Sequence, residues 1–361
     1  KMAGTLLNKK IGIIGGGVTG VITAIFLAKS GCNVTVFEKK ELLSETSSRT
    51  TKLLHGGIRY LESFQIKEVK NGLNDRYWWL KNFPNSTKKI EILIPFKSFF
   101  STQFIKYFIG IKFYQLLSFK KSLGKGRLLS KKTKSNIFIN TNYKNFLTFF
   151  DGAMDDKSLS RKLKDELNML EVDVYENYEV CNFNEAGQVD KFNFDQIILA
   201  AGPWTKILLE KNNIESDKEI DFIKGSHLVI NKSIETGFMF DGICKTRYIF
   251  ALPYENKTLL GTTEKRVDNP DNPKIESEEK DYLINSYNSF FKDQITQEDV
   301  ISSFSGVRPL IKSSNKDFHK STRDFYLQKN KKLIAIFGGK WTTAPSTARK
   351  IVTIIENEEV S

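Results

Sequence analysis

The chain has 361 residues, which is enough for one large or two medium domains with a well-buried core. Its 40% hydrophobic and 27% charged residues are ordinary for a soluble globular protein, and the absence of a long apolar run excludes an ordinary membrane-spanning helix. The formal net charge of +13 favours anionic partners such as phosphorylated substrates, acidic lipid head groups or nucleic acid, although a biased genome explains part of this charge equally well.

Cysteine usage and the first residues indicate the compartment. Cys32, Cys181 and Cys244 lie far apart without CxxC spacing, which fits a reducing compartment and argues against a disulfide framework or a metal site. The start, KMAGTLLNKKIGIIGGG, contains no apolar stretch followed by a cleavage site, so no secretory signal is expected. We therefore expect a cytoplasmic protein, with peripheral attachment to the inner face of the cell membrane as the alternative.

The first forty residues have the order of a dinucleotide-binding βαβ unit. A short apolar run over 11–14 predicts a buried parallel strand, and the segment GGGVTG that follows contains the pattern GxGxxG. A mostly apolar helix then ends at Gly31, and NVTVF over 33–37 predicts a second strand closed by Glu38.

Each part of this unit has a physical role in holding a dinucleotide. Gly15 permits the tight turn, Gly17 lets the backbone approach a pyrophosphate, and Gly20 allows close packing of helix and strand. The helix N-terminus offers N–H groups to the phosphates, and Glu38 accepts hydrogen bonds from the ribose hydroxyls. The motif by itself fits NAD as well as FAD, but its position at the start of the chain favours FAD.

The next loop combines small hydroxyl residues with a glycine pair and two large polar residues. Hydroxyl groups can bind phosphates and flavin ring atoms, and Gly56 and Gly57 would let the backbone approach a flat ring. Arg59 and Tyr60 would then meet a substrate at that ring. The alternative is a solvated helix start with Arg59 as a surface charge.

Seven segments together resemble one family. TSSRTTKLLHGGIRYLE over 46–62 is similar to the signature of FAD-dependent glycerol-3-phosphate dehydrogenases and oxidases, within the D-amino-acid oxidase superfamily. Six further segments resemble the family in the same order: DGAMDD at 151–156, AAGPW at 200–204, KGSHLVI at 224–230, GTTE at 261–264, SGVRPL at 305–310 and GGKWTT at 338–343. They cover nearly the whole chain.

The resemblance and the hydrophobic patterning imply an α/β fold in which a Rossmann-like FAD-binding domain is interleaved with an α+β substrate domain built on an antiparallel sheet. The FAD-binding domain is predicted over 8–90, 150–222 and 300–361, and the substrate or cap domain over 91–149 and 223–299. Further strands are predicted over 195–200, 227–231, 248–253, 258–262 and 333–337, with helices over 276–291 and 345–356.

The segment 92–150 contains no acidic residue, and the spacing at its centre predicts a basic helix rich in phenylalanine. Phe100, Phe104, Phe108 and Ile111 follow helical spacing, with lysines between them. We expect a helical cap that packs these aromatic residues onto the substrate domain, with peripheral contact to a membrane as the alternative. No recognisable nucleic-acid-reading motif occurs here, so no nucleic-acid partner is expected.

The resemblance implies oxidation of sn-glycerol 3-phosphate to dihydroxyacetone phosphate, with hydride transfer to N5 of FAD. The catalytic candidates are His55, Arg59, Tyr60, His227, Arg308 and Lys340. The cations suit a small anionic, phosphorylated substrate, and His55 and His227 are both candidate bases because histidine titrates nearest neutral pH. His319, in a polar stretch, is expected on the surface.

The predicted cofactor contacts follow the same motifs. They are Gly15, Gly17, Val18, Thr19, Gly20, Glu38, Lys39, Thr46, Ser47, Ser48, Lys52, Leu53, Leu54, His55, Val180, Ala201, Gly202, Trp204, Gly339, Lys340, Trp341, Thr342 and Thr343. Oxygen, a quinone and a partner protein all stay open as the electron acceptor.

Three departures from the family bear on the substrate. The chain stops at Ser361, where bacterial members continue into a helical C-terminal domain; Ala344-Pro345 stands in place of Tyr-Arg; and Glu264 replaces Asp. The alternatives are therefore another phosphorylated polyol, a 2-hydroxy acid or an amine as substrate, or a flavin-bearing scaffold without turnover. A scaffold has no need of converging cations, which argues against the last.

Overall fold

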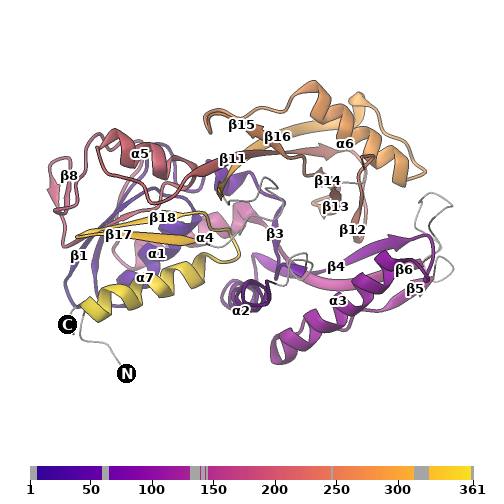
Figure 1. Cartoon of the computed structure of the whole chain (residues 1–361), viewed down its shortest axis with the longest axis horizontal. Coiled ribbons are helices and arrows are strands. Elements are labelled where there is room, and N and C mark those ends of the chain that lie inside the picture. The colour runs from indigo at the N-terminus through magenta and orange to yellow at the C-terminus, as the bar shows by residue number, and fades with distance from the viewer. Residues whose placement is uncertain are drawn as a thin grey trace.

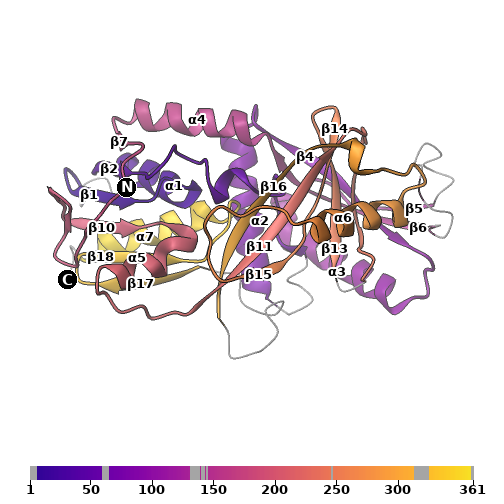
Figure 2. The same ribbon diagram turned by 90° about the horizontal axis from the view of Figure 1, so that it is seen from above.

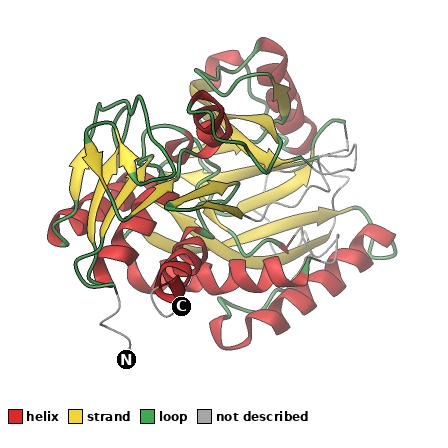
Figure 3. Ribbon diagram, turned by 60° about the vertical axis from the view of Figure 1, so that its left-hand side comes forward, coloured by secondary structure: helices red, strands yellow, loops and turns green. Residues whose placement is uncertain are grey.

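The computed structural model describes residues 6–58, 65–130, 139, 143, 145–244, 247–312 and 325–358. Two large sheets lie side by side (Figure 1), with strands in the interior and helices along the outside (Figure 3). The α/β fold predicted from the sequence is confirmed. Arg59, Tyr60 and His319 lie outside the described residues.

The first sheet has six strands in the order β17-β18-β10-β1-β2-β7. Their bounds are β1 Lys10–Ile14, β2 Asn33–Phe37, β7 Asp173–Tyr175, β10 Gln196–Leu199, β17 Tyr326–Asn330 and β18 Leu333–Phe337. All neighbours run parallel except β17, which pairs antiparallel with β18. The predicted strands at β1, β2, β10 and β18 are confirmed.

Helices cover both faces of this sheet, which explains why its strands read as continuous apolar runs. On one face α1 (Val18–Lys29), α4 (Asp156–Met169) and α7 (Ala344–Glu358) pack over residues such as Ile198 and Ile334 (Figure 2). On the other face α5 (Thr205–Lys211) and the small β8–β9 hairpin (Gln188–Val189 and Phe192–Asn193) cover the alternate residues. The predicted C-terminal helix over 345–356 is α7.

The second sheet has ten strands and is mostly antiparallel. Its path is β15-β11-β14-β13-β12-β4-β6-β3, with β16 beside β11 and β5 beside β6. The bounds are β3 Leu53–Leu54, β4 Thr87–Phe96, β5 Leu128–Ser130, β6 Asn145–Met154, β11 Ile220–Ile230, β12 Gly237–Asp241, β13 Tyr248–Tyr254, β14 Lys257–Gly261, β15 Lys265–Val267 and β16 Val300–Ile311. The strands predicted at β13 and β14 are confirmed.

Strand β11 is longer than the expected 227–231, because β16 pairs with it along its whole length, from Ile220 opposite Ile311 to Ile230 opposite Val300. Helices α2 (Ile66–Asn82) and α3 (Thr102–Ser118) pack on one face of this sheet, and α6 (Ser277–Phe290), predicted over 276–291, packs on the other. Strands β6 and β16 thus join the second sheet, whereas the predicted domain limits assigned half of β6 and all of β16 to the FAD-binding part. Those limits stay a prediction.

Candidate active site

A cavity of about 1290 Å³ has walls from both sheets. On one side it is lined by the residues that follow β1, β2, β10 and β18, including Gly15, Glu38, Ala201 and Gly339. Three parallel pairings join these four strands, so their carboxyl ends meet at one edge of the sheet, where open α/β sheets bind ligands. The opposite wall carries residues of β4, β6, β11, β13 and β16.

The glycine-rich turn forms a cradle at this edge. Gly15 has φ +109°, and a Cβ there would lie 2.4 Å from the carbonyl oxygen of Ala200. A Cβ on Gly20 would lie 1.9 Å from the carbonyl oxygen of Gly15, so this glycine packs helix against turn and does not line the cavity. A Cβ on Gly17 would meet only Ser47 Oγ at 3.3 Å. Gly17 therefore faces open space at the N-terminus of α1.

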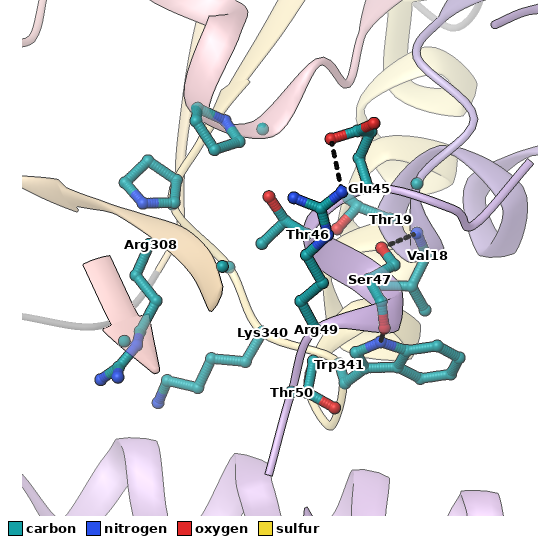
Figure 4. A pocket seen from close by; sticks show the side chains of 18 of the residues that line it. Val18, Thr19, Glu45, Thr46, Ser47, Arg49, Thr50, Arg308, Lys340 and Trp341 are labelled. Atoms are coloured by element: carbon teal, nitrogen blue, oxygen red, sulfur yellow. Dashed lines mark hydrogen bonds and ion pairs between the residues drawn. The ribbon is translucent and has the colours of Figure 1, made fainter. Parts of the chain in front are cut away.

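Ser47 joins this helix to the following loop. Its hydroxyl accepts a hydrogen bond from the Val18 N–H at 2.9 Å, and its carbonyl accepts one from Trp341 Nε1 at 2.7 Å (Figure 4). Glu38 is also held by backbone groups, because its carboxylate accepts hydrogen bonds from the N–H groups of Gly16 at 2.7 Å and Lys40 at 2.9 Å. The polar wall on this side is thus fixed before any ligand binds.

These residues fit an FAD molecule. The bare backbone at Gly17 leaves room for a phosphate, the first turn of α1 presents N–H groups, and the Glu38 carboxylate lines the same cavity. Val180 and Ala201 add apolar surface to that part of the wall. The cavity continues from this cradle to the cationic wall of the second sheet.

Arg308, on β16, is held in that second wall by three oxygens. Its guanidinium donates to Glu264 Oε1 and Thr262 Oγ1, both at 3.1 Å, and to the carbonyl of Thr263 at 3.4 Å. Gly225 on the adjoining strand makes the space, since a Cβ there would lie 2.1 Å from the guanidinium. The buried Glu264 carboxylate also pairs with Arg247 at 3.2 Å.

Lys340 and His227 complete the cationic and basic groups of the site. Figure 4 shows the side chains of Arg308 and Lys340 pointing toward the same side of the pocket. His227, on β11, lies against the ring of Phe304, and its Nε2 is 3.0 Å from Thr51 Oγ1. Burial, reinforced by Arg308 and Lys52, holds the pKa of His227 well below its usual value. The imidazole is therefore neutral near pH 7, so one of its two ring nitrogens is a hydrogen-bond acceptor.

A buried ion pair supports the loop that carries His55. Asp151 Oδ1 accepts hydrogen bonds from the Gly56 N–H at 3.0 Å and from Arg76 and the Tyr114 hydroxyl, each at 3.1 Å. Burial raises the pKa of Asp151, and the Arg76 charge opposes that rise. Because His55 and Gly57 both line the cavity, this pair fixes one edge of the site from α2 and α3.

The structure places most of the predicted site residues at the cavity. From the predicted sets, the lining residues are Gly15, Gly17, Val18, Thr19, Glu38, Lys39, Thr46, Ser47, Leu53, His55, Val180, Ala201, Gly202, Trp204, His227, Arg308, Gly339, Lys340, Trp341 and Thr342. Four others besides Gly20 do not line it: Ser48, Lys52, Leu54 and Thr343.

Local structure explains why these four residues do not line the cavity. Successive strand residues point to opposite faces, so Leu53 lines the cavity while Leu54 belongs to the hydrophobic core of the first sheet and its helices. The Lys52 ammonium is buried and donates to Asp156 and to the Ser48 carbonyl, both at 2.5 Å. The Ser48 hydroxyl donates to the carbonyls of Ser44 and Glu45, and the Thr343 carbonyl accepts hydrogen bonds from Thr347.

Sequence reasoning missed several lining residues. They include Thr50, Thr51, Lys106, Asp151, Tyr248, Phe250, Thr262 and Glu264. The threonines, Asp151 and Glu264 lie within the segments that resemble the family. No spacing rule shows which residues of those segments face the cavity, so these were not singled out. Lys106, Tyr248 and Phe250 reach the cavity only through the packing of α3 and β13, and no local pattern indicates it.

Comparison with known proteins agrees with this geometry. The family model described as "FAD dependent oxidoreductase" (DAO) matches residues 10–353. The aerobic glycerol-3-phosphate dehydrogenases of Bacillus subtilis (strain 168) and Staphylococcus haemolyticus are 32% and 31% identical to this chain over 96% and 95% of its length. The chain spans 66% of the length of these curated relatives.

Solved structures show the same fold. Glycerol-3-phosphate dehydrogenase from Bacillus halodurans complexed with FAD has a TM-score of 0.76 at 24% identity, covering 99% of this chain and 66% of that one. L-α-glycerophosphate oxidase from Mycoplasma pneumoniae with FAD bound also has a TM-score of 0.76, at 20% identity, covering 97% of this chain and 95% of that one. The chain belongs to the DAO family of FAD-dependent oxidoreductases, as its motifs predicted.

Proposed function

We propose that this chain carries the catalytic site of an FAD-dependent oxidoreductase that oxidises sn-glycerol 3-phosphate to dihydroxyacetone phosphate. The observation that supports this most directly is a single cavity joining a dinucleotide cradle to a wall with Arg308, Lys340 and a neutral His227. The names of the Bacillus and Staphylococcus relatives support the same substrate.

The residues divide the work between cofactor and substrate. Gly15, Gly17, Glu38 and Gly339 would hold FAD, which when bound supplies the acceptor for a hydride. Arg308, oriented by Glu264, presents a planar fork suited to a phosphate or to developing charge on oxygen.

The remaining polar groups bind the anionic substrate and accept the proton of its hydroxyl group. Lys340 adds a second cation, and a neutral His227 can accept the hydroxyl proton. His55 also lines the cavity and stays the alternative base.

The visible spectrum of the purified protein, recorded without oxygen, tests this proposal. We expect a yellow protein whose flavin absorbance is lost on addition of sn-glycerol 3-phosphate, because hydride transfer reduces the ring. A yellow protein that stays oxidised would reject this substrate and lead to assays of other phosphorylated polyols, 2-hydroxy acids and amines. A protein that does not bind added FAD would reject the proposal as a whole.

The electron acceptor is tested by reoxidation of the bleached protein. Reoxidation by air indicates oxygen, reoxidation by a soluble quinone indicates a quinone, and reoxidation by neither indicates a partner protein.

We also propose that the outer face of α3 contacts an anionic membrane surface. The helix buries Phe104, Tyr107, Ile111 and Tyr114 against the second sheet, so the predicted cap is correct for Phe104 and Ile111 but wrong for Phe100 and Phe108, which are exposed. On the outer face of α3, Ile109 is 61% exposed and Leu116 is 67% exposed. Phe100, just before the helix begins, is 92% exposed. None of the helices that the structure describes is long and apolar enough to cross a bilayer. Exposed apolar side chains among lysines favour a contact at the lipid surface.

Vesicle sedimentation tests this second proposal. The variant Ile109→Glu with Leu116→Glu is expected to bind vesicles containing phosphatidylglycerol about tenfold or more weakly, because it removes apolar contact and adds negative charge. The matched control is Met169→Glu on α4, where the side chain is 75% exposed on another part of the surface. Equal binding by the double variant and the unchanged protein would rule out this face as the contact.

A further inference from the structure

Thr51 and His227 form a polar pair in the cavity wall. They lie 176 residues apart in sequence, and Thr51 Oγ1 is 3.0 Å from His227 Nε2. Thr51 belongs to the loop between the short helical turn at Thr46–Ser48 and β3, whereas His227 belongs to β11. Both side chains line the cavity that contains Arg308 and Lys340.

The imidazole of His227 is held rigidly by the two strands beside β11. Phe304 on β16 stacks on the ring at 4.9 Å between centroids with 18° between planes. Gly261 on β14 faces the other edge, where a Cβ would lie 2.3 Å from His227 Cδ2. The side chain is only 2% exposed. A ring confined in this way keeps its Nε2 directed at Thr51.

The other ring nitrogen of His227, Nδ1, forms no hydrogen bond to a described residue that would compete with the contact between Nε2 and Thr51. Nδ1 of His227 is buried and has no hydrogen-bond partner among the residues that the structure describes. Thr51, by contrast, is partly exposed at the cavity wall. A molecule in the cavity therefore meets a hydroxyl group before it meets the imidazole. The positive charges of Arg308 and Lys52 disfavour a protonated ring at rest, as the lowered pKa of His227 reflects.

We propose that Thr51 is a proton-relay residue, which connects the substrate hydroxyl to His227; this inference rests on the proposed function. In this step the substrate hydroxyl gives its proton to Thr51 Oγ1 while the Thr51 proton passes to Nε2 of His227. Bound FAD would supply the acceptor for the hydride of the same carbon with its electron pair, so that the carbon–oxygen bond would become a carbonyl. The relay requires the resting imidazole to carry its proton on Nδ1 and to accept from Thr51 at Nε2.

Two substitutions at one position test the relay. Thr51→Val keeps the shape of the side chain and removes the hydroxyl, so the rate of flavin reduction by sn-glycerol 3-phosphate should fall about tenfold or more. Thr51→Ser retains the hydroxyl and should restore the rate to within about threefold. The matched control is Thr35→Val on β2, which is half-buried and does not line the cavity. A normal rate in Thr51→Val, or an equally slow Thr51→Ser, would overturn the proposal.

Nitrogen NMR of the histidine rings gives a readout that does not depend on turnover. With selectively labelled histidine, His227 is assigned by its loss in His227→Asn, since the chain contains three histidines. We expect an unprotonated Nε2 in the unchanged protein and a shifted resonance in Thr51→Val. A protonated Nε2, or no shift, would overturn the relay. If sn-glycerol 3-phosphate fails to bleach the flavin while the NMR result holds, the proposed substrate fails but the Thr51–His227 pair does not.

Discussion

Replacement of Arg308 by alanine is expected to lower kcat/KM for sn-glycerol 3-phosphate by about 100-fold or more, because it removes a charge-assisted fork from the substrate wall. The fold should persist, since Glu264 keeps its ion pair with Arg247 at 3.2 Å. Anaerobic stopped-flow measurement of flavin reduction over a range of substrate concentrations checks the rate and the affinity together. FAD content and the thermal midpoint report on the fold.

Arg308→Lys is the matched control for charge. A lysine keeps one positive charge but loses the planar contact with Glu264 and Thr262, so we expect a loss smaller than that of alanine but still measurable. Unchanged turnover and unchanged substrate affinity in Arg308→Ala would remove this residue from the site. That result would also leave the proposed anionic substrate without its principal cation.

Alanine at Gly17 is expected to leave the fold intact and to weaken FAD binding by about tenfold to 100-fold, through lost hydrogen bonds to the pyrophosphate. Gly17 has φ −70° and ψ 176°, a conformation open to alanine, and its Cβ would meet only Ser47 Oγ at 3.3 Å. The added methyl group instead enters the space that a phosphate would use. Fluorescence titration of the FAD-free protein with FAD measures the affinity, and circular dichroism measures the fold.

Gly15→Ala separates backbone strain from cofactor contact. Its φ of +109° and the 2.4 Å distance from an added Cβ to the Ala200 carbonyl oxygen make alanine unfavourable even in the absence of a ligand. We expect the FAD-free Gly15→Ala protein to lose about 2 kcal/mol or more of unfolding free energy, while FAD-free Gly17→Ala loses little. Equal FAD affinity in Gly17→Ala and the unchanged protein would show that the cofactor does not approach this backbone.

The local sequence was sufficient to predict the main strands of the first sheet and the glycine-rich cradle at its edge. The strands β1, β2, β10 and β18 are short and mainly apolar, and most of their residues are buried. The cradle lies within one βαβ unit, where the order of strand, turn and helix fixes the geometry over a few residues. Neighbouring residues determine such features, so the sequence predicted them.

The orientation of side chains in the following loop depended on more than its motif. Lys52 has φ +59° and buries its ammonium beside Asp156, and Leu54 turns into the core while Leu53 faces the cavity. The motif TSSRTTKLLH contains all three residues but does not say which way each one points. The pairing of β3 with β6 decides this, because that register sets which face of the strand meets the cavity.

The sequence by itself therefore determined the family and the dinucleotide cradle, and most of the site residues it predicted lie at the cavity. Tertiary structure alone brought Thr51 to His227 and Glu264 to both Arg247 and Arg308. These contacts cross between strands whose register is fixed by pairing over long separations, such as Ile223 opposite Arg308 and His227 opposite Phe304. A shift of one residue in that register would turn the same side chains to the opposite face of the sheet.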